Sequence, residues 1–145
     1  MAGLAAVAAP LVGPSLRIPQ VRRALLRMVM ERGDRMSAVD AAAMIADAAE
    51  CSIVDEFAKA TNRDGPFVGD MSHVTAPIRV AWSQNDRLLV ADTHARPLLD
   101  RVTDSDFVVL PGVGHTPMYD DPLLVVATVL EVTLAADSES IASLS

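Results

Sequence analysis

Two ionisable side chains, Asp86 and His115, each come shortly after an apolar segment, and they form the pair with the clearest chemical use. Asp86 follows IRVAW (78–82), and His115 ends the sequence DFVVLPGVGH (106–115). A carboxylate that accepts a hydrogen bond from one imidazole nitrogen fixes the tautomer of the ring, and the other nitrogen then takes a proton from a nucleophile or water. We therefore predict that Asp86 and His115 are catalytic residues.

Each of these residues also has an ordinary structural explanation. Asp86 follows Asn85 and is of a type common in turns, whereas a partly exposed loop position is a common place for a histidine such as His115. Taken singly, these explanations are favoured. The two residues follow strand-like segments, and Gly112 and Gly114 beside His115 permit a tight backbone path. Together, these features favour the catalytic pair.

The two apolar segments predict the secondary structure that positions the pair. Residues 78–82 and 106–110 have the pattern of buried strands, and the residues between them are too many for a hairpin. They suffice for the helical crossover of a parallel pair, so the segment predicts a β-α-β unit. In an open parallel sheet, the loops at the carboxyl ends of the strands meet at the ligand crevice, which would bring Asp86 and His115 together.

Helices are expected on both sides of the second strand. Because proline is tolerated only near the first turn of a helix, Pro97 predicts a crossover helix that starts after Thr93 and ends near Arg101. Asp121 followed by Pro122 predicts the start of a last helix. That helix is expected to end near residue 134, and the side chains predicted to face the sheet are Leu123, Val126, Leu130 and Leu134.

The first part of the chain has a helical pattern. Residues 19–32 predict a helix with an arginine-rich face, which we interpret as solvated, the alternative being a membrane-surface or partner-binding helix. Its predicted apolar stripe is Val21, Leu25, Met28 and Val29. Ser37 and Ser52, each with an aspartate three residues later, predict helices over 38–50 and 53–60. We divide the chain into a helical cap-like region (1–70), a core with both site residues (71–135) and a disordered tail (136–145).

Composition excludes several classes of function. The formal net charge of -7 makes general nucleic-acid binding improbable. Cys51, the only cysteine, excludes an internal disulfide, fits a cytoplasmic protein and is expected to be a buried apolar residue. The apolar N-terminal run is broken by Pro10 and is shorter than the roughly 20 residues that a membrane span needs. His73 and His94 lack partners at metal-ligand spacing, so we expect no metal or other cofactor.

The tracts APIRVAWSQNDRLLV and DFVVLPGVGHTPMYDDPLLVVATVL closely resemble the C-terminal part of an α/β-hydrolase with a helical cap. In that family, an acid follows one late strand in a Gly-x-x-Asp loop, and a Gly-His pair after the last strand supplies the catalytic histidine. The resemblance covers residues 77–134 and implies that Asp86 is the acid and His115 the histidine. Ser83 replaces the usual glycine of the acid loop, and residues 17–70 resemble a cap only in being helical and rich in small residues and methionine.

The family's nucleophile motif, Gly-x-Ser-x-Gly, does not occur in the sequence. We therefore expect an incomplete α/β-hydrolase fold with two parallel C-terminal strands, as in a truncated reading frame or part of a longer enzyme. The complete enzyme would hydrolyse an ester or similar bond of a small, largely apolar substrate, and the chain alone would be inactive. The alternative is a non-catalytic binding or assembly module. In both cases the exposed edge of the sheet is available to pair with another chain.

Overall fold

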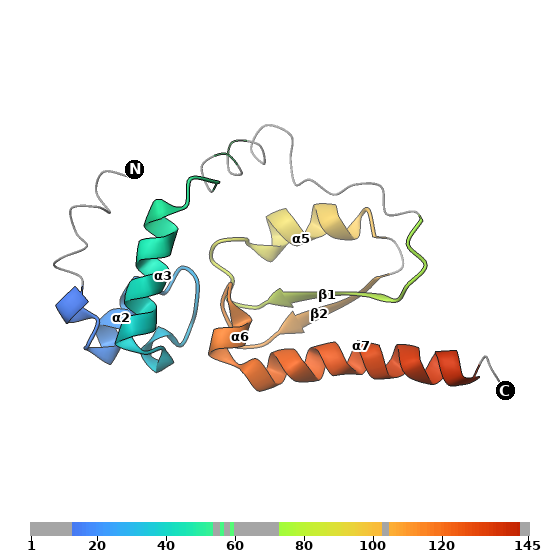
Figure 1. Ribbon diagram of the computed structural model, residues 1–145. Helices are drawn as coiled ribbons and strands as arrows, with labels where there is room; N and C mark the ends of the chain where they lie inside the picture. Colours follow the sequence, from blue (N-terminus) through green and yellow to red (C-terminus); the bar gives the residue numbers. More distant parts are fainter. Residues whose placement is uncertain (1–12, 54–55, 57–58, 60–72, 103–104, 143–145) are drawn as a thin grey trace.

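The computed structural model describes residues 13–53, 56, 59, 73–102 and 105–142, and within them the architecture is mixed α/β. A small sheet of two parallel strands lies beside a group of helices from the first part of the chain (Figure 1). The elements are α2 (Pro19–Leu25), the 3₁₀ turn η1 (Gly33–Arg35), α3 (Ala38–Glu50), β1 (Ile78–Ser83), α5 (Ala91–Leu99), β2 (Ser105–Leu110), α6 (Pro117–Asp120) and α7 (Pro122–Ala142).

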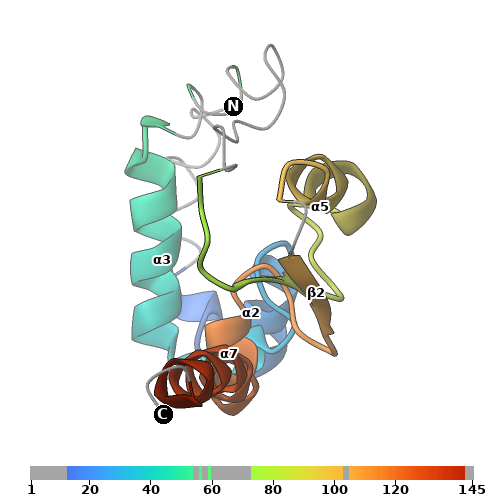
Figure 2. The same cartoon turned by 90° about the vertical axis from the view of Figure 1, so that its right-hand side faces the viewer.

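The predicted β-α-β unit is confirmed. β1 and β2 are parallel, with a register that runs from Ile78 opposite Ser105 to Ser83 opposite Leu110. Helix α5 makes the crossover, and α7 lies on the opposite face of the sheet, as two perpendicular views show (Figures 1 and 2). Because the strands are parallel and in register, the loop after Ser83 and the loop after Leu110 leave the same end of the sheet.

The strands are less buried than their apolar sequences predict. Phe107 and Val109 of β2 are exposed, Val109 to 53 %. The reason is the width of the sheet, because in the described part of the chain each strand has only one hydrogen-bonded neighbour. A parallel sheet is normally covered on both faces and continued at its edges, so this one presents apolar surface and an unpaired edge of β1.

Helix α5 starts earlier than predicted, at Ala91, and Pro97 lies inside it rather than in its first turn. The amides of Thr93 and His94 both donate to the carbonyl of Val90, at 3.2 and 3.0 Å, which closes the first turn before the proline is reached. Pro97 lies near the end of the helix, so its missing N–H deprives only the carbonyl of Thr93 of an intrahelical donor. A short helix tolerates that loss.

Helix α7 begins as predicted, with the Leu124 amide donating to Asp121 Oδ1 at 3.0 Å, but it runs to Ala142. The predicted disordered tail is therefore wrong over 136–142, where no glycine or proline interrupts the helix. The predicted sheet-facing side is also wrong. The side chains Leu123, Val126, Leu130 and Leu134 are all exposed, Leu123 to 78 %. Most of the helix circumference is apolar, so the sequence pattern does not select a face.

The helices of the first part of the chain have their own small core. Its buried residues are Leu16, Leu26, Met30, Met36 and Ala41. The predicted helix over 19–32 stops as α2 at Leu25. Two residues of the predicted apolar stripe are exposed: Leu25, the last residue of α2, and Met28, which lies beyond the helix. Arg22, predicted to be solvated, is buried because its guanidinium donates to the carbonyls of Leu16 and Asp34, at 2.6 and 3.0 Å.

Helix α3 has the predicted bounds and the predicted cap. The Asp40 amide donates to Ser37 Oγ at 3.0 Å. Cys51, which follows the helix, is exposed rather than buried, because the last turn of α3 is exposed as well. Most of the predicted helix 53–60 and the predicted boundary near Met71 lie outside the described residues. Within the described residues, every helix is too short or too polar to cross a membrane.

Candidate functional site

Asp86 and His115, predicted from widely separated positions, lie side by side at the carboxyl ends of the two strands. Asp86 Oδ2 and His115 Nδ1 are 2.9 Å apart. The carboxylate is almost fully buried, with 8 % of its side chain exposed, whereas 29 % of the imidazole is exposed. The pair therefore joins a buried acid to a ring that reaches the surface.

The Asp86 carboxylate is surrounded by donors. Its Oδ1 accepts hydrogen bonds from the backbone amides of Leu88 and Leu89, at 2.9 and 2.8 Å. An ionised carboxylate only accepts hydrogen bonds, so the third contact requires that His115 Nδ1 carries the proton. In the neutral ring, Nε2 is then the nitrogen with a lone pair, and it forms no hydrogen bond within the described part of the chain. This is the tautomer that a general base needs.

The two loops that carry the pair are bonded to each other. The Asn85 amide donates to the carbonyl of Val113 at 3.0 Å, and the Gly112 amide donates to Gln84 Oε1 at 2.9 Å. Gly112 has a φ of 70°, in the left-handed region that side-chain-bearing residues seldom adopt. That turn sends the backbone back across the end of the sheet and brings His115 to Asp86.

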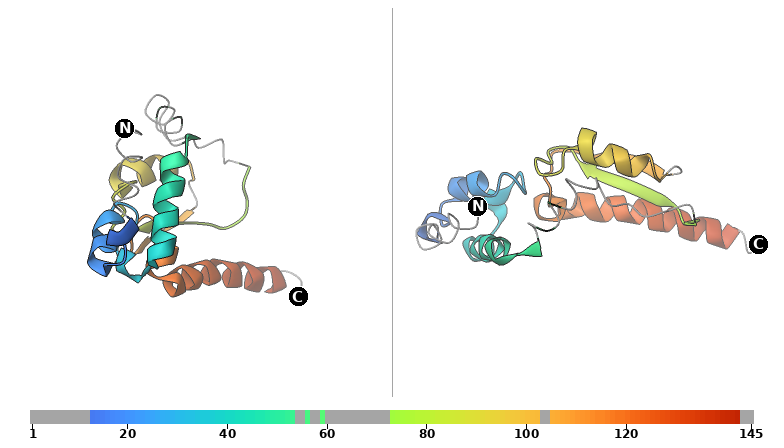
Figure 3. Two further views of the ribbon diagram at one scale, coloured as in Figure 1. Left: turned by 60° about the vertical axis from the view of Figure 1, so that its left-hand side comes forward. Right: turned by 90° about the horizontal axis from the view of Figure 1, so that it is seen from above.

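The histidine loop also rests on the chain that follows α2, a contact that the sequence did not predict. The Thr116 amide and hydroxyl both donate to the carbonyl of Val29, each at 2.8 Å. On the other loop, Arg87 donates to the carbonyl of Arg27 at 3.0 Å and forms an ion pair with Glu31. The chain after α2 thus contacts both loops of the site. Figure 3 shows the first helices at this end of the sheet.

Asp120 is the residue of this region that sequence reasoning missed. Its side chain is fully buried. It accepts hydrogen bonds from the amides of Gly114, Glu31 and Arg32, at 2.7, 2.9 and 2.7 Å. A carboxylate just before Asp121 and Pro122 looks like another helix-start residue, so the sequence offered no separate signal for it.

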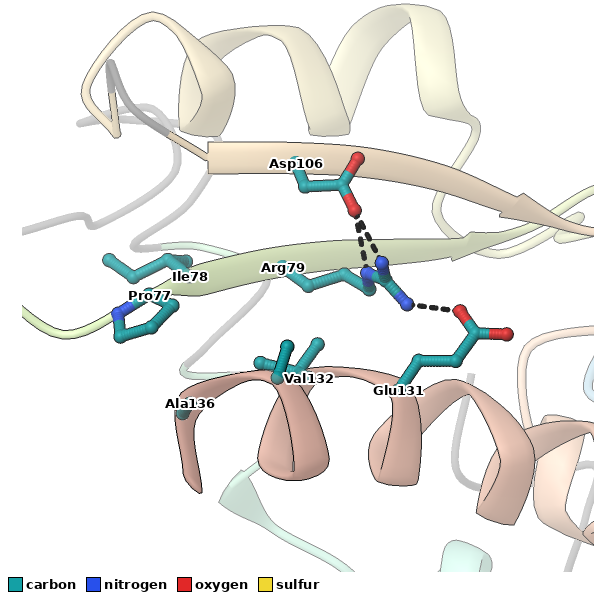
Figure 4. A pocket seen from close by; sticks show the side chains of 8 residues that line it. Pro77, Ile78, Arg79, Asp106, Glu131, Val132 and Ala136 are labelled. Carbon is teal, nitrogen blue, oxygen red and sulfur yellow. Dashed lines mark hydrogen bonds and ion pairs between the residues drawn. The ribbon is translucent and has the colours of Figure 1, made fainter. Parts of the chain in front are cut away.

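A second polar cluster lies near the other end of the sheet, around a hollow of about 150 Å³ between β1 and α7 (Figure 4). Arg79 of β1 bonds to Asp106 of β2 at 2.7 Å and to Glu131 of α7 at 2.5 Å. The hydrogen bonds to Glu131, and secondly to Asp106, raise the pKa of the Arg79 guanidinium above its ordinary value. Because both carboxylates neutralise it, we interpret Arg79 as a clamp rather than an anion site.

Replacing Arg79 with glutamine is expected to lower the melting temperature, since α7 would lose its ionic link to the sheet. The loss should be greatest at low salt and should shrink as salt screens the pairs in the wild type. Thermal melting of Arg79→Gln at two salt concentrations measures this. Arg27→Gln is the matched control, because the Arg27 side chain is exposed and forms no ion pair with any described residue. Equal losses in the two variants would contradict the clamp.

Metal ligands do not cluster in this site. Within the described ranges, no three histidine, cysteine, aspartate or glutamate side chains are grouped so that they could hold a metal ion. His94 lies in α5, where its Nδ1 is 2.8 Å from Thr93 Oγ1 and 3.0 Å from the carbonyl of Val90, and His73 lies in an exposed turn.

Comparison with known proteins adds no assignment. No family model, curated protein or solved structure matches this chain.

Proposed function

We propose that this chain is the C-terminal part of an α/β-hydrolase and supplies the acid and the histidine of a Ser-His-Asp type triad. The observation that carries the proposal is the 2.9 Å contact between Asp86 Oδ2 and His115 Nδ1, with Asp86 Oδ1 already bonded to two backbone amides. A buried, fully bonded acid behind a partly exposed imidazole is the arrangement that general-base catalysis uses.

In this reaction the exposed nitrogen of His115 does the proton transfer. Nε2 takes the proton of a nucleophilic hydroxyl as the nucleophile attacks the substrate carbonyl, and the resulting imidazolium is stabilised by Asp86. His115 then returns the proton to the leaving alcohol, and the acyl-enzyme is hydrolysed by water in the same way. The nucleophile comes from a Gly-x-Ser-x-Gly elbow outside these 145 residues, on strands that continue the sheet beyond β1.

The open side of the sheet supports this arrangement. The edge of β1 is unpaired in the described structure, and apolar side chains of β2 and α7 are exposed. A parallel sheet of two strands rarely stands alone, so additional strands and helices would bury this surface. We propose an ester of a small, largely apolar molecule as the substrate and a cytoplasmic location. Epoxides, haloalkanes and carbon-carbon bonds next to carbonyls are alternative substrates for such an acid-histidine pair. Assays of the complete polypeptide with each of them would show which bond it cleaves.

The coding DNA upstream of the Met1 codon tests the proposal. We expect an in-frame extension that contains a strand followed by Gly-x-Ser-x-Gly. A nearby in-frame stop codon, together with a stable and specific oligomer of the isolated chain in size-exclusion chromatography, would contradict the proposal and support a binding or assembly module.

The isolated chain provides a second test. Because it lacks the nucleophile motif, its hydrolysis of p-nitrophenyl acetate should not exceed that of the His115→Ala variant. This prediction concerns the 145 residues alone, whereas the complete polypeptide should hydrolyse the ester with burst kinetics. Turnover by the isolated chain well above the His115→Ala control would show that a nucleophile or an activated water is already present, and would contradict the assignment of the nucleophile to another segment.

A further inference from the structure

The buried carboxylate of Asp120 belongs to α6, yet all three amides bonded to its side chain lie outside that helix. Gly114 donates from the histidine loop, and Glu31 and Arg32 donate from the chain after α2. Asp120 is 0 % exposed. A buried carboxylate is tolerated where donors satisfy it, and here three amides at 2.7 to 2.9 Å do so. The side chain therefore joins two segments that are far apart in the sequence.

These bonds lie directly beside His115. Gly114, one peptide bond before the histidine, donates to Asp120 and packs so closely on the backbone of Met30 that a Cβ atom would lie 2.9 Å from Met30 Cα. Thr116, one peptide bond after the histidine, donates twice to the carbonyl of Val29. The backbone of His115 is thus held on both sides by residues 29–32, through Asp120 on one side.

We propose that Asp120 is a positioning residue for His115, and that residues 29–32 form the platform against which it holds the histidine loop. The inference rests on the proposed function, because Asp120 controls the position of the His115 ring that lets Nδ1 reach Asp86. It also gives the segment after α2 a role in the site, since one of its two connections to the backbone beside His115 runs through this carboxylate. Loss of Asp120 should loosen the loop and weaken the Asp86 contact without removing either site residue.

The test is NMR of the 145-residue chain, with Asp120→Asn compared with the wild type and with Asp121→Asn as the matched control. Asp121 is the neighbouring carboxylate, and it caps α7 without bonding to the histidine loop. In Asp120→Asn, an amide group replaces one acceptor oxygen and faces a backbone donor. We expect the Gly114 amide to exchange at least about tenfold faster, as the loss of a hydrogen bond to a charged group predicts.

The tautomer of His115 distinguishes positioning from stability. Long-range ¹H–¹⁵N spectra at alkaline pH report which ring nitrogen carries the proton. We expect the Nδ1–H form in the wild type and in Asp121→Asn, and a mixture of Nδ1–H and Nε2–H forms in Asp120→Asn. Asp120→Glu, which keeps the charge, should retain more of the Nδ1–H form than Asp120→Asn. A folded Asp120→Asn variant with the wild-type tautomer would overturn the inference, even if its melting temperature is lower.

If Asp120→Asn does not fold, Thr116→Val loosens the other side of the histidine by removing one of the two bonds to Val29. The same spectra should then show a smaller admixture of the Nε2–H form, and an unchanged tautomer would overturn the inference. The wild-type spectrum separates this outcome from failure of the proposed function. If the wild type itself lacks the Nδ1–H form, the acid-histidine pair fails. If the wild type has the Nδ1–H form and the Asp120→Asn and Thr116→Val variants keep it, the acid-histidine pair stands and only the positioning role fails.

Discussion

Replacing Asp86 with asparagine should abolish the function of the site while the fold persists. Asp86 Oδ1 accepts from the amides of Leu88 and Leu89, so the carbonyl oxygen of the new amide must occupy that position. Its NH₂ group then faces His115 Nδ1, which becomes the acceptor, and the ring proton moves to Nε2. A ring protonated on Nε2 cannot take a proton from a nucleophile, and turnover by the polypeptide that contains the nucleophile should fall about ten-thousand-fold.

The activity measurement is kcat for ester hydrolysis by the complete polypeptide, with thermal melting to confirm folding. Asp92→Asn is the matched control, because Asp92 is an exposed carboxylate in the first turn of α5 and does not contact the pair. It should leave kcat within about twofold of the wild type. A loss in Asp86→Asn of less than about tenfold would mean that the reaction does not depend on the acid.

The two glycines of the histidine loop should respond to substitution for different reasons. A Cβ atom at Gly114 would lie 2.9 Å from Met30 Cα and 3.2 Å from the Glu31 nitrogen, both backbone atoms that do not move easily. Gly114→Ala should therefore cost about 1 to 3 kcal/mol of unfolding free energy, as overpacking does. The displaced loop should also lose its hydrogen bond to Asp120.

Gly112 has open space around it but a φ of 70°, so Gly112→Ala should cost about 1 to 2 kcal/mol through backbone strain alone. Asparagine tolerates this conformation better than alanine, so Gly112→Asn should recover part of the loss, whereas Gly114→Asn should recover none. Urea denaturation of the four variants measures these costs. Equal recovery by asparagine at both positions would contradict the close approach of Gly114 to Met30.

The sequence predicted the proximity of Asp86 and His115 better than it predicted the packing. The Asp86 and His115 pair was predictable because strand order and parallel pairing alone bring the two loops to one end of the sheet. The side of α7 that faces outward was not predictable, because Leu123 is as apolar as the half-buried Leu124. Only tertiary contacts, such as that of Glu131 with Arg79, select the face.

Buried polar groups were the other limit. Arg22 and Asp120 are buried where backbone groups from other segments bond to them: two carbonyls accept from the terminal nitrogens of Arg22, and three amides donate to Asp120. Such partners depend on the path of the chain, which periodicity does not predict. The start of α5 was also misplaced: sequence reasoning put Pro97 in the first turn, whereas the helix starts at Ala91 and Pro97 lies near its end.

The location of the proton on the His115 ring tests the acid-histidine pair most directly. In the wild-type 145-residue chain at alkaline pH, long-range ¹H–¹⁵N spectra should show the ring proton on Nδ1. In Asp86→Asn, the same spectra should show it on Nε2. A wild-type ring protonated on Nε2, with no change in the Asp86→Asn variant, would contradict the pair and the hydrolase proposal that depends on it.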